Sequence, residues 1–171
     1  MIEIEKFEQI CKSYFNFLKS NYGFHLVTTI EDDCSYEILF KSTLVGVSLT
    51  FEFRDFYLFV KLCRLQNGEF PPKPGEIRPD TLLKCFDLDD VVLIRSKESL
   101  IPPYQLDTKF DEALLESIVK RQADNLKLFT KDILKGDFSL FSELDKIVKD
   151  RARKAAIQKW GNKAAEFGWI V

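Results

Sequence analysis

The chain has few of the residues that mark a fibrous or low-complexity protein. Only seven of its 171 residues are glycine and only one is methionine, which argues against a disordered chain and against a soft methionine-lined groove. Sixteen phenylalanines, five tyrosines and two tryptophans instead supply large rings for a core. With 46% hydrophobic and 30% charged residues, the composition is that of a soluble protein, and we expect one globular domain over residues 1–171.

Long hydrophobic runs and targeting signals are also missing. The longest strongly apolar runs, at residues 56–60 and 91–94, are far shorter than the roughly 20 residues that a membrane span requires. The first five residues have neither a basic start nor a continuous apolar stretch. The sequence therefore predicts a cytoplasmic protein that does not interact with a membrane.

Few side chains could hold a metal ion. Cys11, Cys34, Cys63 and Cys85 form no Cys-x-x-Cys pair, and His25 is the one histidine in the chain. An even number of cysteines could form two disulfides, but a chain with this core and no export signal does not need them. We expect four reduced thiols and no metal site.

Catalytic motifs are equally scarce. The chain has no glycine-rich loop between a strand and a helix and no Gly-x-Ser-x-Gly sequence. His25 has no serine, cysteine or carboxylate partner nearby in sequence, so we interpret it as structural. Asp87, Asp89 and Asp90 lack the glycine and final glutamate of a calcium loop, and Asp87 or Asp89 is interpreted as a helix cap. The sequence predicts no catalytic residue and no cofactor, although an enzyme with an unrecognised site stays as an alternative.

Hydrophobic periodicity predicts helices at both ends of the chain. Apolar residues recur every three or four positions in these segments. Gly23 and Gly136 are expected to end two of the helices in a left-handed conformation, Asp111 to begin the long one, and Asp137 or Ser139 to cap the last one. The predicted helices span residues 4–22, 80–95, 111–135 and about 139–160.

Between residues 24 and 66 the period changes to two, which is typical of strands with one buried face. A two-residue turn at residues 54–55 would pair Phe53 with Phe56 and Phe51 with Leu58, and a turn at residues 42–43 would pair Ile38 with Val47. Both registers place apolar side chains on one face. With a further strand at residues 24–30, the sequence predicts an α+β fold in which a four-stranded antiparallel meander carries an N-terminal helix and C-terminal helices on one face.

The opposite face of this predicted meander is half aromatic and half charged, a composition typical of protein interfaces. All six prolines lie between residues 71 and 103, and we expect residues 69–79 to be extended and outside the sheet. The alternative is that this segment or the apolar tail covers Tyr57 and Phe59 as a second internal layer. The predicted partner-binding residues are Glu52, Arg54, Tyr57, Phe59, Phe70, Glu76 and Arg78.

Charge is distributed unevenly along the chain. The net charge is −2, but residues 146–171 alone carry +5, so the remainder carries −7. A basic helix could contact nucleic acid through Lys149, Arg151, Arg153 and Lys154. Nucleic acid is the less favoured partner, because no base-stacking module or helix-turn-helix accompanies these cations.

Residues 134–144, followed by Val148 and Arg151, look like the C-terminal pattern of a group of small bacterial proteins, and residues 47–55 with 65–68 are similar to their sheet region. These proteins are of the immunity type that guards a cell against polymorphic toxins. The resemblance implies a binding protein whose partner is a toxin domain, and it brings no catalytic residue. Such a protein blocks its partner sterically and by complementary charge, without a cofactor.

Overall fold

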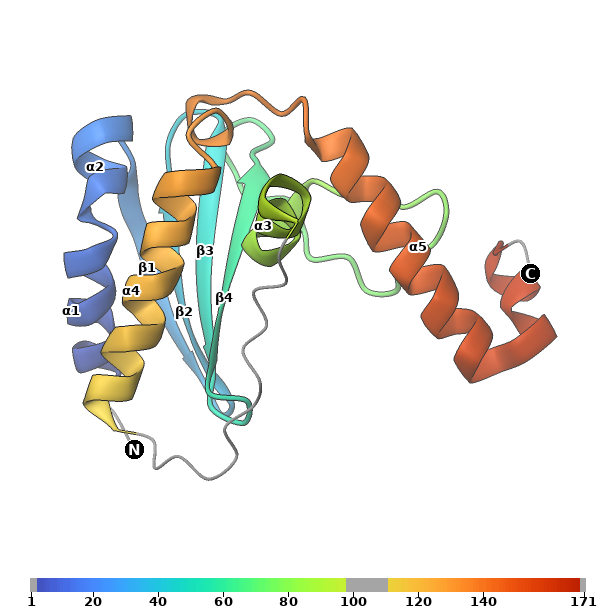
Figure 1. Ribbon diagram of the computed structural model, residues 1–171, viewed down its shortest axis with the longest axis horizontal. Coiled ribbons are helices and arrows are strands. Elements are labelled where there is room, and N and C mark those ends of the chain that lie inside the picture. The colour runs from blue at the N-terminus through green and yellow to red at the C-terminus, as the bar shows by residue number, and fades with distance from the viewer. Residues whose placement is uncertain (1–2, 98–110, 170–171) are drawn as a thin grey trace.

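The computed structural model describes residues 3–97 and 111–169, and in these it has five α-helices, five strands and two 3-10 helices (Figure 1). The predicted α+β fold is confirmed. The elements in chain order are α1 (Ile4–Tyr14), α2 (Asn16–Tyr22), β1 (His25–Asp32), β2 (Ser35–Lys41), β3 (Val45–Glu52), β4 (Tyr57–Arg64), β5 (Cys85–Asp87), α3 (Leu88–Ser96), α4 (Glu112–Phe129), η1 (Ile133–Lys135), α5 (Phe141–Trp160) and η2 (Gly161–Phe167). None of the helices in the described ranges has the length and apolar character needed to cross a bilayer.

All strands belong to one antiparallel sheet in the order β1-β2-β3-β4-β5. The four predicted strands are confirmed, and β5 is an addition. Helix was predicted over residues 80–95, but Cys85–Asp87 extend along β4, where Phe86 pairs with Leu62, and the helix begins only at Leu88. A strand of three residues is too short to show a period of two.

The predicted register is confirmed for one hairpin and shifted in the other. Phe51 pairs with Leu58 as expected, but Phe53 and Phe56 lie in a four-residue turn and do not pair. Ile38 pairs with Leu49 where Val47 was predicted. The Ser42 amide donates to the Val45 carbonyl at 2.8 Å and so closes a longer loop than the predicted two-residue turn. A shift of two residues keeps the same side chains on the buried face.

Helices α1, α2 and α4 cover one face of the sheet, which we call the inner face (Figure 1). The predicted helix over residues 4–22 is interrupted at Phe15, whose backbone leaves the helical region at φ −95° and ψ 8° while its side chain stays buried. Gly23 ends α2 at φ 69°, as predicted. The Asp111 side chain accepts a hydrogen bond from the Leu114 amide at 2.9 Å and caps α4, which begins at Glu112, one residue after the predicted start.

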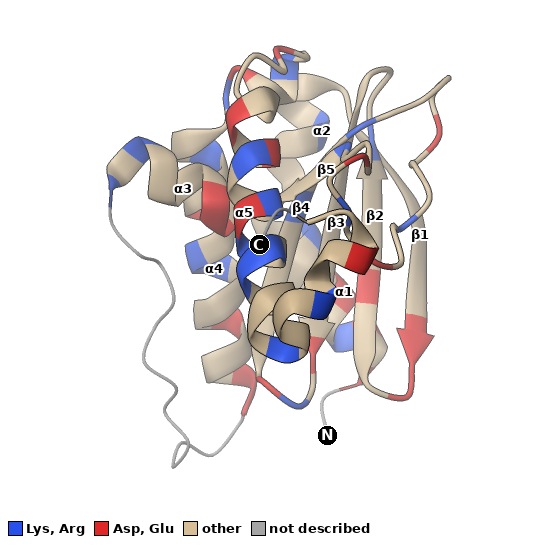
Figure 2. Ribbon diagram, turned by 90° about the vertical axis from the view of Figure 1, so that its right-hand side faces the viewer, with Lys and Arg blue, Asp and Glu red and all other residues tan. Residues whose placement is uncertain are grey.

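The C-terminal helices do not all lie on the inner face. Helix α4 ends at Phe129, short of the predicted residue 135, and α5 runs on the opposite side of the sheet (Figures 1 and 2). Only the first two turns of α5 join the main core: Phe141 and Leu144 are buried in it, and Val148 packs against it. We call α5 and η2 the C-terminal arm. The predicted caps of α5 are wrong, since Leu140 occupies the cap position and Asp137 instead accepts from the Ser139 amide.

The prediction of four reduced thiols is wrong for two of them. Cys63 and Cys85 face each other across β4 and β5, with Cα atoms 4.0 Å apart, and form a disulfide. Cys11 and Cys34 are free, the first buried and the second exposed. The spacing of 22 residues contains no sign of this pairing, because it depends on β5, which the sequence did not predict.

Candidate interaction surface

The outer face of the sheet is the side turned away from α1 and α4 (Figure 1). On this face Glu52 lies opposite Tyr57 and Thr50 lies opposite Phe59. Glu37 on β2 pairs with Thr50, and the Ser48 hydroxyl donates to the Glu37 carboxylate at 2.9 Å. The outer face is therefore the mixed aromatic and polar surface that the alternation predicts.

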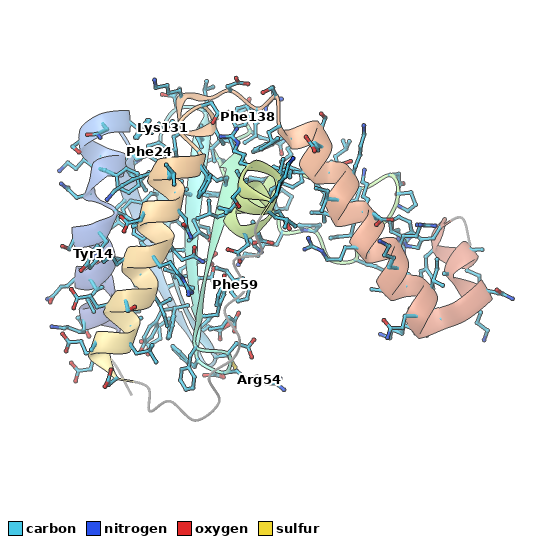
Figure 3. All side chains as sticks on the ribbon, viewed as in Figure 1. Tyr14, Phe24, Arg54, Phe59, Lys131 and Phe138 are labelled. Carbon is cyan, nitrogen blue, oxygen red and sulfur yellow. A yellow bond between two sulfur atoms is a disulfide. The ribbon has the colours of Figure 1, made fainter. Side chains whose placement is uncertain are left out.

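Four of the predicted partner-binding residues lie together at the end of the β3–β4 hairpin. Arg54 is exposed in the turn, and Glu52, the last residue of β3, is half-buried. Figure 3 shows Arg54 at the tip of the hairpin and Phe59 further along it. The rings of Tyr57 and Phe59 meet edge to face with centroids 4.9 Å apart. We call Glu52, Arg54, Tyr57 and Phe59 the hairpin cluster.

Phe70 lies at the other end of the outer face. Its ring packs on Gly46, so closely that a Cβ at Gly46 would lie 2.4 Å from its Cε1 atom. Gly46 and Glu52 are six residues apart on β3, which is roughly 20 Å of strand. The structure therefore separates Phe70 from the hairpin cluster.

The proline-rich segment lies outside the sheet, as predicted, since residues 70–84 contain no helix or strand and Glu69 pairs only with Gln66 in an isolated bridge. It is interrupted by bends at residues 75–76 and a turn at residues 79–80. It crosses the outer face near β2, where Lys73 pairs with Glu37 at 3.1 Å. The proline-rich segment therefore covers the Gly46 end of the outer face, whereas the alternative had placed it over Tyr57 and Phe59. At the hairpin end, Tyr57 and Phe59 both stay partly exposed.

Glu76 and Arg78 form a third group further along this segment. Their side chains pair with each other at 3.3 Å and are about half exposed. Pro79 follows directly and lies against Gly168, which comes just after η2. A Cβ atom added to Gly168 would lie 3.7 Å from the Pro79 ring. Trp169, next to Gly168, is buried, and residues 170–171 lie outside the described ranges.

Tyr57 has an internal role that sequence reasoning missed. Its hydroxyl donates to Asp89 Oδ2 at 2.6 Å, and Gln122 Nε2 donates to Tyr57 Oη at 3.2 Å and to the Leu58 carbonyl at 3.0 Å. Burial, and then the hydrogen bond to Asp89, raises the pKa of Tyr57 above its usual value of 10. The sequence feature that could have indicated this role is Gln122, a polar residue within the otherwise apolar stripe of its helix.

The Asp87–Asp90 cluster joins the sheet, α3 and the C-terminal arm. Asp90 is buried and pairs with Arg151 of α5 at 2.5 Å. Asp87 occupies the cap position of α3, as predicted, but its side chain makes no capping hydrogen bond. Burial raises the pKa of Asp87 above its usual value of 3.8. Within the part of the chain that is described, no three histidine, cysteine or acidic side chains are grouped as metal ligands.

The four cations considered for nucleic-acid binding each lie against a carboxylate. Their charges are therefore partly neutralised within the chain, which weakens the case for a phosphate-binding patch. The pairs are Lys149–Asp145 at 3.0 Å, Arg151–Asp90 at 2.5 Å, Arg153–Asp150 at 3.3 Å and Lys154–Asp150 at 2.7 Å.

Comparisons of the chain with protein-family models, with curated proteins and with solved structures each found no match. The geometry of the hairpin cluster and its surroundings is therefore the basis for assigning a function.

Proposed function

We propose that this chain is a protein-binding module that docks its partner on the hairpin cluster. The observation that supports this is the contrast between the two sides of β3 and β4. On the inner side, Leu49 and Leu58 are fully buried and Phe51 is 2% exposed. On the outer side Tyr57 and Phe59 stay partly exposed, and at these two residues β4 pairs with β3 alone, because β5 pairs only with Lys61–Cys63.

The two rings of the hairpin cluster are held by contacts within the chain. Asp89 and Gln122 hold the Tyr57 hydroxyl, and Phe59 packs against the Tyr57 ring. Aromatic side chains that are already fixed lose little conformational entropy on binding. Glu52 and Arg54 at the rim supply charges of both signs, which favour specificity over raw affinity.

The partner that we propose is a toxin domain, which the chain would neutralise in the cytoplasm by covering its surface. This part of the proposal is supported by the resemblance of residues 47–55 and 134–144 to immunity proteins. It is also supported by the net charge of −7 outside residues 146–171, which would speed the encounter with a basic toxin. Cytosolic thiols are kept reduced, so the docking surface must persist when Cys63 and Cys85 are reduced.

The test is affinity capture from the native cell with three versions of the full chain, each with and without reductant. Phe59→Asp combined with Arg54→Glu should lose the bound protein, while Leu82→Asp should retain it, because Leu82 is 84% exposed and lies outside the cluster. We expect the affinity for the captured protein to fall at least about tenfold in the first variant, as for a central interface residue. Equal binding by all three versions would refute the proposal.

A second arm tests the toxin. The captured protein is expressed alone and together with the chain, and the proposal expects it to arrest growth only when it is alone. If co-expression of wild type and of the Phe59→Asp, Arg54→Glu variant protects equally, the hairpin cluster is not the neutralising surface.

A further inference from the structure

Strand β1 is an open edge of the sheet. Its backbone pairs only with β2, and no backbone hydrogen bond from another described residue reaches its other side. Figure 2 shows β1 at the outer rim of the sheet. In an antiparallel pair, alternate residues turn their N–H and C=O groups away from the partner strand. The eight residues of β1 therefore present a row of free backbone groups that a further strand could pair with.

The edge lacks most of the features that protect exposed strands. It contains no proline and no lysine, and Val27 and Ile30 expose 41% and 43% of their surface. A bulge between Leu26 and Thr28 disturbs the start of the strand. Residues 28–32 keep a regular register with β2, so the stretch that is fit for pairing is five residues long.

The end of this stretch is strongly acidic. Glu31, Asp32 and Asp33 are all exposed, and no cation of the described residues lies within ion-pair distance of them. Figure 2 shows the acidic colour at the end of β1. Burial raises the pKa of Tyr36 on the neighbouring strand, and the negative charges of Glu31 and Glu5 raise it further. The end of β1 therefore attracts positive charge.

We propose that β1 binds an extended basic segment of a partner protein, which adds to the sheet as a sixth strand beside residues 28–32 and places its cations near Glu31, Asp32 and Asp33. Backbone hydrogen bonds give the affinity in this mode of recognition, and side chains give the specificity. A second copy of the chain would bring no lysine or arginine on its own β1 to these carboxylates. The inference rests on the proposed protein-binding function, but it concerns a different surface from the hairpin cluster.

The test uses a fluorescent eight-residue peptide that alternates lysine with valine or threonine. Fluorescence anisotropy measures its binding to the full chain, and amide hydrogen exchange shows whether residues 28–32 become protected. Two control peptides have glutamate in place of lysine, or N-methyl groups on alternate residues that remove backbone donors. We expect the basic peptide to bind and to protect the amides of β1 from exchange. Each control peptide should bind with an affinity at least about tenfold lower, since both charge and backbone pairing contribute.

Variants of the chain separate this edge from general electrostatic attraction. Glu31→Gln, Asp32→Asn and Asp33→Asn together should weaken peptide binding about tenfold, given a modest contribution from each exposed charge. The matched control has the same charge change on exposed residues elsewhere, namely Asp80→Asn, Glu143→Gln and Glu166→Gln, and it should bind like wild type.

Two peptide results would overturn the inference: an N-methylated peptide that binds as well as its parent, or an acidic peptide that binds as well as the basic one. It would also be overturned if the control variant lost as much peptide affinity as the β1 variant, or if sedimentation without peptide showed a dimer formed through β1. The Phe59→Asp, Arg54→Glu variant should bind the peptide normally. The two proposals therefore fail separately, because the captured partner depends on the hairpin cluster and the peptide depends on β1.

Discussion

The contact between Gly46 and Phe70 decides whether the proline-rich segment is held on the outer face, and Gly46→Ala tests it. Gly46 lies in β3 between Lys41 and Cys63 and does not have a positive φ. In a strand of ordinary geometry, alanine is favoured over glycine by about 0.5 to 1 kcal/mol, because the unfolded glycine chain has more freedom to lose. A loss of stability in this variant would therefore have to come from contacts of the new methyl group.

The structure predicts such contacts. The added Cβ would lie 2.4 and 2.7 Å from two atoms of the Phe70 ring and 2.9 Å from Leu65 Cδ2. Overpacking of this kind costs about 1 to 3 kcal/mol, so after the gain from alanine we expect a net loss of roughly 1 to 2 kcal/mol. Removing the ring by Phe70→Ala should relieve most of the clash, because the remaining contact is with the end of a flexible side chain.

Urea unfolding of wild type, both single variants and the double variant completes a double-mutant cycle. We expect a coupling energy of about 1 to 2 kcal/mol between Gly46 and Phe70, and faster amide exchange at residues 66–70 in Gly46→Ala. If Gly46→Ala is as stable as wild type, or if it costs the same with and without the ring, Phe70 does not lie on Gly46 and the segment is not anchored there.

Three further predictions concern the junction around β5. Arg151→Met should lower the free energy of unfolding by about 1 to 3 kcal/mol, because the buried Asp90 carboxylate loses its donor; Arg151→Lys should lose less in the same urea titration. Asp87→Asn should stabilise the fold at pH 7, because burial raises the pKa of Asp87 and its ionised form opposes folding. The difference in unfolding free energy between this variant and wild type should shrink as the pH falls from the raised pKa of Asp87 in the folded chain to its usual pKa of 3.8. Unfolding curves that differ equally at pH 7 and pH 3 would contradict this prediction. Cys85→Ser should cost about 3 kcal/mol in chain entropy, measured without reductant, and wild type with reductant should match the variant.

The two hairpins show how much of the sheet can be predicted from side-chain alternation alone. Alternation predicted correctly which side chains of β2, β3 and β4 face the core, and it predicted the pairing of Phe51 with Leu58. It did not predict the loop length between β2 and β3, because any even shift leaves the same residues buried. The Ser42–Val45 hydrogen bond selects the observed register, and the Ser-Thr sequence of the turn gave no sign of it.

For the candidate surface, too, the local pattern predicted which residues share a face but not which distant segments meet there. Composition and alternation predicted that Glu52, Tyr57 and Phe59 share one face, and the hairpin brings them together with Arg54. The predicted grouping with Phe70 failed because the proline-rich segment returns to the sheet at Gly46 and not at the hairpin. A segment without periodic side chains or backbone pairing does not indicate where along the strands it will lie.

The sequence by itself determined which faces of the strands are buried and that residues 69–79 stay out of the sheet, because side-chain alternation and the missing N–H of proline are local properties of the chain. The tertiary structure alone decided that Cys63 meets Cys85, that Asp90 meets Arg151, and that β1 is left as an open edge. These features depend on which distant segments arrive side by side, and that follows from how the whole chain buries its apolar surface.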